Sequence, residues 1–209
     1  MNDIVIVGSG GFAKEVALLI EDINNITPRW NLLGFINSDI GNRNGKYIVY
    51  NDDEWLINVV RKLYVVIGIG NPLIIRNIIN KLNINKNLIF PNLIHPNVIM
   101  GNVNMNDGNI ICAGNIFTVD IDIDSFNIFN MNCTIGHDVK IGSCNVINPT
   151  SNISGCVKIN DCILIGTGSQ ILENLSICSN VKIGAGSVVT KNINEMGTYV
   201  GIPSKKIIK

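Results

Sequence analysis

The chain has 209 residues, which is enough for one large domain or two small ones with a full hydrophobic core. Its 16 basic and 16 acidic residues balance, and no run of Lys or Arg is long enough to follow a phosphate backbone, so nucleic acid is not expected as a partner. The short apolar start "IVIVG" lacks a basic leader, and no stretch approaches the length of a membrane span. We therefore expect a cytoplasmic protein without membrane insertion.

The first ninety residues alternate short β-branched runs with helical patterns. Residues 3–8 ("DIVIVG"), 31–37 ("NLLGFIN") and 62–68 ("KLYVVIG") are typical of buried parallel strands. Residues 11–24 and 72–83 have the spacing of helices. The pattern predicts a small Rossmann-like βαβαβ domain over residues 1–90, with only three or so strands.

A glycine-rich turn, Gly8-Ser9-Gly10-Gly11, follows the first strand and opens the first helix. Backbone amides at such a turn can approach a phosphate, and the helix N-terminus favours negative charge. The alternative is a tight turn without a ligand. The turn lacks the complete dinucleotide fingerprint, so a mononucleotide head group fits better than NAD. After the second strand, Asn37-Ser38-Asp39 stands where polar side chains meet a ribose or base, unless it is an ordinary polar turn.

From Leu93 onward one apolar residue returns at every sixth position, through 17 consecutive positions to Val189. A hexapeptide repeat of this kind indicates a parallel β-helix in which three hexapeptides form one coil, so residues 18 apart stack. Residues 91–209 would then be a left-handed β-helix domain, in which the repeat makes roughly five coils about 4.8 Å apart. No loop interrupts the register. The flat faces must therefore pack against other copies, and we expect a homotrimer.

His137 is one of only two histidines, and it stands in "TIGHDVKIGS" two places after Ile135, near a corner of the predicted coil. One coil further along the chain is Gly155, whose amide would lie about 4.8 Å from the imidazole. A general base and an oxyanion donor would then share one corner, with Asp138 beside them to hold the tautomer. The alternative is a surface histidine that follows a glycine by chance.

Other polar and sulfur-containing side chains have structural interpretations. His95 precedes His137 by 42 residues, which places it on another side of the predicted coil, so we assign it to structure. Asp120, Asp122 and Asp124 alternate with aliphatic residues and look like a solvated face, although a site nearby is an alternative. The six cysteines include no CxxC pair, and we expect reduced thiols used for packing.

The motifs together resemble a known family. In chain order they are "GSGGFAKEV", "GFINSD", "VVIGIGN" followed by Arg76, "LIHPN", "GHDVKIG", "ISGCV", "KIGAGSVVTKN" and "GIPSKK". Their order resembles that of bacterial sugar acetyltransferases in which a small nucleotide-binding domain precedes a left-handed β-helix. Members of that family include N-acetyltransferases of nucleotide-linked 4-amino-sugars and the sialic acid O-acetyltransferase type.

The resemblance implies roles for individual residues. His137 would be the general base, Asp138 would increase its basicity, and the Gly155 amide would bind the thioester carbonyl of acetyl-CoA. Thr167 and Ala185 would line the coenzyme A cleft between subunits. The nucleotide-sugar site would contain Gly10, Gly11, Phe12, Asn37, Ser38 and the turn from Gly68 to Gly70.

The chain departs from the family pattern at two places. Many relatives have a pair of acids where this chain has Asn37-Ser38, and many carry a second histidine nine residues after the base, where this chain has Val146 preceded by Asn145. Any contact made by those groups is missing here, and the substrate assignment is weakened more than the chemistry.

The resemblance therefore implies an acetyl-CoA-dependent N-acetyltransferase that acts on the 4-amino group of a UDP- or dTDP-linked amino-deoxy-sugar and needs no metal. Its product would serve surface glycan synthesis, such as O-antigen or capsule, or a glycoprotein sugar. The alternatives are a sugar O-acetyltransferase, a non-catalytic scaffold that binds nucleotide sugars, and a zinc hydratase. A hydratase site needs three histidines, whereas the chain has two.

Overall fold

The computed structural model describes residues 1–207. The chain forms two compact units, residues 1–96 and the chain from Asn97 onward. The sequence analysis predicts the boundary between the two domains at residues 90/91, where the hexapeptide repeat begins. No helix among the described residues is both long and apolar enough to cross a membrane.

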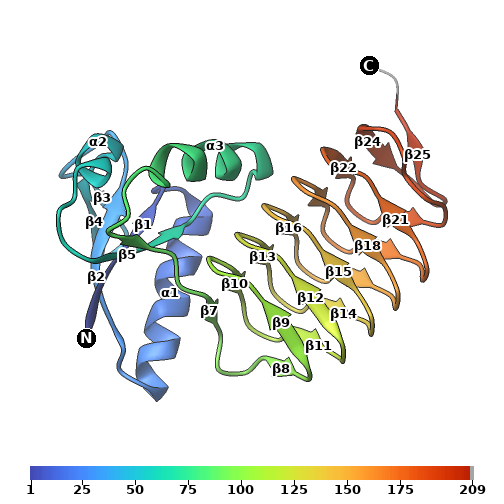
Figure 1. The fold of residues 1–209 in the computed structure, drawn as a ribbon, viewed down its shortest axis with the longest axis horizontal. Helices are drawn as coiled ribbons and strands as arrows, with labels where there is room; N and C mark the ends of the chain where they lie inside the picture. Colours follow the sequence, from blue (N-terminus) through green and yellow to red (C-terminus); the bar gives the residue numbers. More distant parts are fainter. Residues whose placement is uncertain (208–209) are drawn as a thin grey trace. The chain divides into compact units, whose positions relative to one another are not determined.

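Unit 1 contains a six-stranded sheet with the order β3-β4-β2-β1-β5-β6 (Figure 1). Its strand pairs are parallel, except for the antiparallel pair of β3 with β4. The strands are β1 (Asn2–Val7), β2 (Trp30–Ile36), β3 (Arg43–Asn44), β4 (Tyr47–Asn51), β5 (Leu63–Ile67) and β6 (Leu88–Ile89). The short strand β7 (Leu93–Ile94) follows at the end of the unit.

Three helices connect these strands: α1 (Gly11–Ile26), α2 (Asp53–Ile57) and α3 (Pro72–Leu82). The helix α1 buries Ala13, Val16 and Ile20, which recur at helical spacing. The predicted βαβαβ core is therefore confirmed in β1, α1, β2, β5 and α3. The expectation of only three strands was wrong, because the β3–β4 hairpin and the two-residue strand β6 extend the sheet on both sides.

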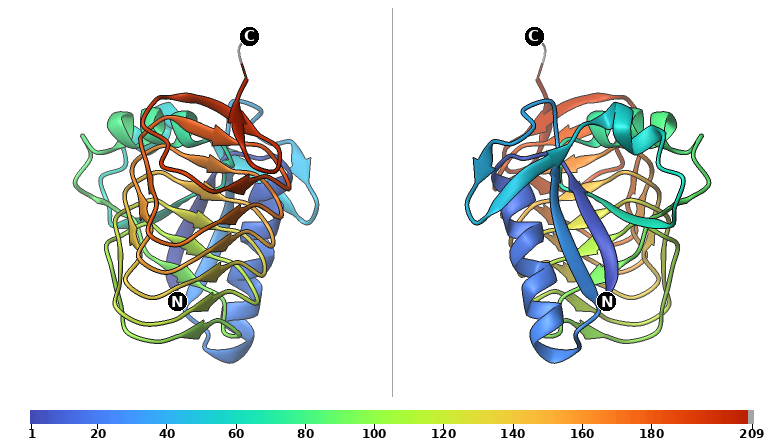
Figure 2. Two further views of the ribbon diagram at one scale, coloured as in Figure 1. Left: turned by 90° about the vertical axis from the view of Figure 1, so that its right-hand side faces the viewer. Right: turned by 90° about the vertical axis from the view of Figure 1, so that its left-hand side faces the viewer.

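Unit 2 is a parallel β-helix whose coils present three sheets, and Figure 2 shows the coils stacked when this unit is viewed from its end. The first sheet contains β10 (Ile110–Ile111), β13 (Ile128–Phe129), β16 (Val146–Ile147), β19 (Leu164–Ile165), β22 (Val181–Ile183), β24 (Gly197–Val200) and β25 (Lys205–Lys206). The second contains β8 (Ile99–Met100), β11 (Ile116–Phe117), β14 (Thr134–Ile135), β17 (Asn152–Ile153), β20 (Gln170–Ile171) and β23 (Val188–Val189). The third contains β9 (Val103–Met105), β12 (Ile121–Ile123), β15 (Lys140–Ile141), β18 (Lys158–Ile159) and β21 (Ser176–Ile177).

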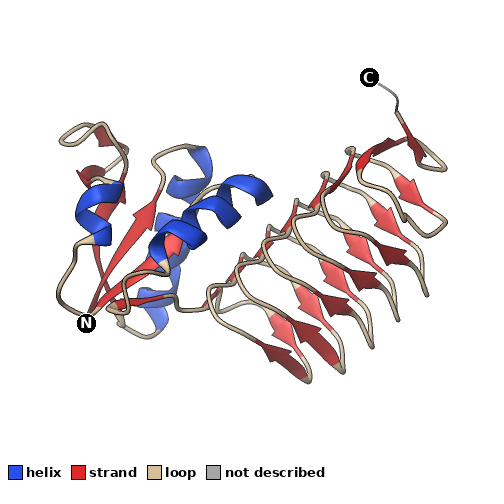
Figure 3. Ribbon diagram, turned by 45° about the horizontal axis from the view of Figure 1, so that its top comes forward, coloured by secondary structure: helices blue, strands red, loops and turns tan. Residues whose placement is uncertain are grey.

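The predicted stacking of residues 18 apart is confirmed in the strand registers of this unit. Ile135 pairs with Ile153, and Ile141 pairs with Ile159. These side chains are 1 to 3% exposed and form the interior of the coils. In Figure 3 the short strands are joined by tan turns, which are the corners of each coil.

The corners repeat one backbone conformation. Every sixth residue from Gly108 to Gly186 has a positive φ, and the residues that carry it include Asp138 (φ 58°) and Cys156 (φ 60°). Asn, Asp and Gly tolerate this left-handed region best, which explains why they are frequent at these positions. Consecutive corners are therefore superimposable, and side chains one coil apart leave the corner in the same direction.

Buried amides also stabilise the stack of coils. The Oδ1 atom of Asn109 accepts from the backbone N–H of Asn127 at 2.9 Å, and Asn127 does the same for Asn145 at 2.9 Å. Asn145 Oδ1 accepts from the backbone N–H of Ile163 at 2.8 Å. The ladder ends there because isoleucine has no side-chain amide to continue it. Each amide satisfies a backbone donor that would otherwise be buried without a partner.

Candidate active site

His137 lies at the corner that follows β14, where its imidazole is open to solvent. Its side chain is 60% exposed, and its backbone oxygen accepts from the N–H of Cys156 at 2.8 Å. The imidazole Nδ1 lies 2.8 Å from Asp138 Oδ2. Because an ionised carboxylate can only accept a hydrogen bond, Nδ1 carries the proton and the lone pair of the neutral ring is on Nε2. That nitrogen is ready to accept a proton from a substrate.

Gly155, one coil further on, packs directly against this imidazole. A methyl group built on its Cα would lie 2.5 Å from His137 Nε2 and 2.6 Å from Cε1, closer than atoms can approach. The position therefore has room for the imidazole only because residue 155 is glycine. Within the described chain, no acceptor contacts the Gly155 N–H, although its carbonyl accepts from Asn174 at 3.1 Å. An imidazole nitrogen with a free lone pair and a free backbone donor thus share one exposed corner.

A third side chain at this corner is Cys156, which the sequence analysis assigned to packing with the other cysteines. Its thiol is exposed, and ligand atoms of His137, Asp138 and Cys156 all lie within 4.8 Å of one another. The cause is the stacking rule, since Cys156 is one coil after Asp138. Applying that rule to Asp138 as well as to His137 would have found it.

The other described cysteines agree better with packing. All six thiols are free, as expected, and Cys144 and Cys162 are buried. Cys133 is also buried, and its thiol donates to the carbonyl of Asn148 at 3.2 Å. Burial raises the pKa of the Cys133 thiol to about 11, so this thiol is not a nucleophile at neutral pH.

The two residues expected at the coenzyme A cleft lie elsewhere on the coil. Thr167 follows β19 and Ala185 follows β22, and both are exposed. They stack one coil apart, since the N–H of Gly186 donates to the Thr167 carbonyl at 2.8 Å. This corner joins the first sheet to the second, whereas His137 and Gly155 are at the corner between the second and third. The chain therefore does not bring Thr167 and Ala185 to His137 by itself.

In unit 1, the turn before α1 presents a free helix N-terminus. Gly10 caps α1 without any side-chain hydrogen bond, and the first turn contains no acid. A Cβ at Gly10 or Gly11 would meet no atom within 4 Å, so both glycines border open space, and half-buried Phe12 follows them. Unpaired amides and a positive helix end together favour an anion such as a phosphate.

The predicted Asn37 and Ser38 lie beside this turn. Asn37 Nδ2 donates to Ser9 Oγ at 2.5 Å, and Ser38 is exposed. Asn44, at the β3–β4 hairpin, donates through Nδ2 to the Ser9 carbonyl. Ser9 and Asn44 were not predicted as site residues, and the hairpin that carries Asn44 gave no periodic signal.

The turn after β5 contains two glycines in different surroundings. A Cβ at Gly68 would lie 2.6 Å from Ile6 Cγ2 and 3.0 Å from Ala13 Cα, so this glycine lets α1 pack on the sheet. A Cβ at Gly70 would meet nothing within 4 Å, and this glycine is exposed. Close packing explains Gly68 without a ligand, whereas Gly70 borders open space.

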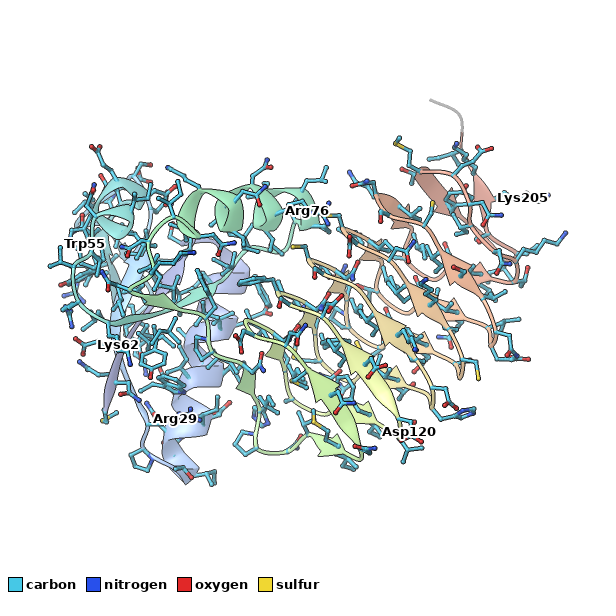
Figure 4. All side chains as sticks on the ribbon, in the orientation of Figure 1. Arg29, Trp55, Lys62, Arg76, Asp120 and Lys205 are labelled. Atoms are coloured by element: carbon cyan, nitrogen blue, oxygen red, sulfur yellow. The ribbon has the colours of Figure 1, made fainter. Side chains whose placement is uncertain are left out.

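The residues assigned to structure have structural partners. His95 Nε2 lies 3.4 Å from Asp22 Oδ2 of α1. Asp120, which Figure 4 labels, accepts from Asn102 Nδ2 at 2.9 Å and is exposed, in agreement with a solvated face. Val146, which stands where relatives have a second histidine, is 2% exposed on β16.

A hollow of about 850 Å³ extends along β9, β12, β15 and β18. Its lining includes Asn104, Asp122, Lys140 and Lys158. It contains none of the predicted site residues. The corner of His137 is instead exposed, and a further surface would be needed to enclose a substrate there.

Comparison with known proteins agrees with this fold. Residues 3–82 match the model of the PglD N-terminal domain family. No curated protein matches the sequence. The acetyltransferase domain of PglB from Neisseria gonorrhoeae, solved with acetyl coenzyme A, is 23% identical with a TM-score of 0.90, over 99% of this chain and 100% of that one.

Two further structures are similar over nearly the whole chain. PerB from Caulobacter crescentus, solved with CoA and GDP-perosamine, is 23% identical with a TM-score of 0.88, over 99% of this chain and 98% of that one. WeeI from Acinetobacter baumannii is 26% identical with a TM-score of 0.84, over 99% of this chain and 100% of that one.

The two units thus have the fold of the bacterial sugar acetyltransferases that join a small α/β domain to a left-handed β-helix, as the motifs predicted.

Proposed function

We propose that this protein transfers the acetyl group of acetyl-CoA to the 4-amino group of a nucleotide-linked amino-deoxy-sugar, for surface glycan or glycoprotein sugar synthesis. The observation that carries the proposal is the corner at which the imidazole of His137 packs on the unpartnered amide of Gly155. The similarity in fold to structures that contain acetyl-CoA, or CoA with GDP-perosamine, supports the same chemistry.

The reaction is a direct transfer. The sugar nitrogen attacks the thioester carbonyl, and His137 Nε2 accepts the proton that the nitrogen loses. The carbonyl oxygen gains negative charge, which the Gly155 N–H stabilises by a hydrogen bond. The carbon–sulfur bond then breaks, and the imidazolium returns the proton to the CoA thiolate. Asp138 keeps the Nε2 lone pair free before transfer and stabilises the imidazolium during it. No step needs a metal.

Substrate binding would use the turn before α1. The diphosphate of the nucleotide would bind to the free amides at Gly10, Gly11 and Phe12, and the ribose or base would lie near Asn37, Ser38 and Gly70. Gly68 is better explained by packing, and we propose no ligand contact for it. One amide, Asn37, and one hydroxyl, Ser38, replace the acid pair of relatives, and the acceptor screen described below distinguishes uracil, thymine and guanine nucleotides.

Replacing Asp138 with asparagine tests the positioning of the base. Asparagine tolerates the positive φ at this corner, so the backbone is preserved. Both side chains of the pair are 60% exposed, and an exposed ion pair contributes about 1 kcal/mol or less. We therefore expect kcat to fall by up to about fivefold with little change in KM, measured by steady-state kinetics. A rise in KM with unchanged kcat would contradict the positioning role.

The separation of the two corners supports a site that is shared between copies. The base and Gly155 of one subunit would face Thr167 and Ala185 of the partner subunit, which would line the cleft for coenzyme A. A homotrimer has three such clefts.

Complementation between two inactive variants tests this arrangement. Thr167→Arg would block the coenzyme cleft and His137→Ala would remove the base, so each variant alone should be inactive. Co-expressed in equal amounts with different tags, they should recover about a quarter of the wild-type activity, because one site in four receives both intact parts. No recovery in purified mixed oligomers would contradict a shared site.

A screen of acceptors identifies the substrate. UDP-, dTDP- and GDP-linked 4-amino-sugars would be incubated with acetyl-CoA, and products detected by mass spectrometry. The proposal expects a single added acetyl group on one of them and none on the matched 4-hydroxy-sugars. Acetylation of a hydroxyl instead would establish the O-acetyltransferase alternative, and binding of nucleotide sugars without turnover would establish the scaffold.

A further inference from the structure

The candidate catalytic corner contains one thiol that the transfer reaction does not use. Cys156 is exposed, and its backbone is held by the hydrogen bond from its N–H to the His137 carbonyl at 2.8 Å. Because Asp138 and Cys156 occupy equivalent corner positions with φ values of 58° and 60°, their side chains leave the β-helix in the same direction. The thiol therefore lies over the carboxylate and beside the imidazole.

We infer that His137, Asp138 and Cys156 form a binding site for a borderline-soft divalent cation such as Zn²⁺. Their ligand atoms lie within 4.8 Å of one another, and no other such group of three occurs within residues 1–207. Tetrahedral zinc with nitrogen, oxygen and sulfur ligands separates its ligand atoms by about 3.3 to 3.8 Å. All three side chains are exposed and can rotate about their χ angles. Moving their ligand atoms closer together by roughly 1 to 1.5 Å gives the zinc spacing without any change of backbone.

The chemistry of the donors selects the metal. One imidazole nitrogen, one carboxylate oxygen and one thiolate suit Zn²⁺, whereas Mg²⁺ and Ca²⁺ prefer sets of oxygen ligands. Three protein ligands leave a fourth position for water. On binding, the thiol of Cys156 releases its proton to solvent, and the imidazole gives a lone pair to the metal.

The consequence of binding is inhibition, and this part of the inference rests on the proposed function. A metal on Nδ1 would require the ring proton to sit on Nε2, and a metal on Nε2 would take the lone pair that should accept the proton of the substrate. In either case His137 is lost as a base. Zinc should therefore be a reversible inhibitor of acetyl transfer, because it occupies the imidazole that would otherwise accept the proton of the substrate.

Cobalt binding tests the site without any assay of activity. Co²⁺ would be added to the chelator-treated full-length protein, and the thiolate-to-cobalt charge-transfer absorption recorded, followed by displacement with Zn²⁺. The wild type should bind one ion per chain, and Cys156→Ser should lose the absorption. Its zinc affinity should fall at least about tenfold, since even outer-shell partners of metals contribute about 10- to 100-fold. Cys178→Ser, which changes a half-buried thiol outside the group, is the matched control and should bind like the wild type.

Activity assays complete the test. Cys156→Ser should retain basal activity and become resistant to zinc, while the wild type and Cys178→Ser are inhibited. No metal binding, or binding that survives in Cys156→Ser, would overturn the metal site while leaving the proposed function intact. Zinc binding through Cys156 in a protein that acetylates no sugar would leave the metal site standing and refute the proposed function.

Discussion

Substituting His137 with alanine should lower kcat/KM at least about a hundredfold, because the variant loses the group that we propose as the acceptor of the amine proton. The fold should survive, since the side chain is 60% exposed and contributes little to the core. The measurement is the initial rate of acetyl transfer to the best acceptor, with thermal unfolding recorded for the same samples.

The matched control is the other histidine. His95 contacts Asp22 in unit 1 and has no part in the proposed reaction, so His95→Ala should keep its activity. If His137→Ala acetylates at the wild-type rate, the imidazole is not the base. If both variants lose activity to the same extent together with stability, the effect is structural.

The substitution Gly155→Ala should lower activity by displacing the His137 imidazole rather than by removing it. The added carbon would lie 2.5 Å from His137 Nε2, and the imidazole is the movable partner, so we expect the ring to rotate away and lose its contact with Asp138. Misplacement of a catalytic group by about 1 Å can cost about a hundredfold in rate. Gly155→Ala should therefore lose about that factor in kcat/KM. Unfolding should change little, because the φ of Gly155 is not in the left-handed region.

The double variant His137→Ala with Gly155→Ala separates this clash from other effects. Without the imidazole the methyl group has space, so the second substitution should cost nothing further in activity or stability. A Gly155→Ala enzyme with wild-type activity would show that the imidazole does not need this position. An additive loss in the double variant would show that Gly155 acts independently of His137.

The sequence predicted the parts of the fold that repeat. Every sixth residue from Leu93 is apolar, and this period correctly predicted the coil of 18 residues and the contact between His137 and Gly155. The same rule places Cys156 one coil after Asp138, so the spacing also predicts the thiol at this corner. The signal was therefore present in the spacing and not in the residue type.

Other parts left no periodic trace. The two-residue strands β3 and β6 and the five-residue helix α2 are too short for an amphipathic pattern. The buried ladder that includes Asn109 and Asn127 consists of polar residues, which an apolar period does not mark. These side-chain amides are buried, and each one accepts a hydrogen bond from a backbone N–H of the next coil.

The substrate site could be predicted only in outline. The glycine turn before α1 is evident from "GSGG", yet only the structure separates Gly10, which borders open space, from Gly68, which packs against Ile6. Ser9 accepts hydrogen bonds from the side chains of Asn37 and Asn44. The contact with Asn44 depends on the β3–β4 hairpin, which the sequence did not predict.

The decisive measurement is a crystal structure of the protein with CoA and the accepted amino-sugar nucleotide. We expect the sugar nitrogen within about 3 Å of His137 Nε2 and the CoA sulfur beside the Gly155 amide, where the carbonyl oxygen of an acetyl group on that sulfur would lie about 2.7–3.1 Å from the amide nitrogen. A coenzyme bound at another corner, or a corner of His137 covered by protein packing in the assembled oligomer, would contradict it.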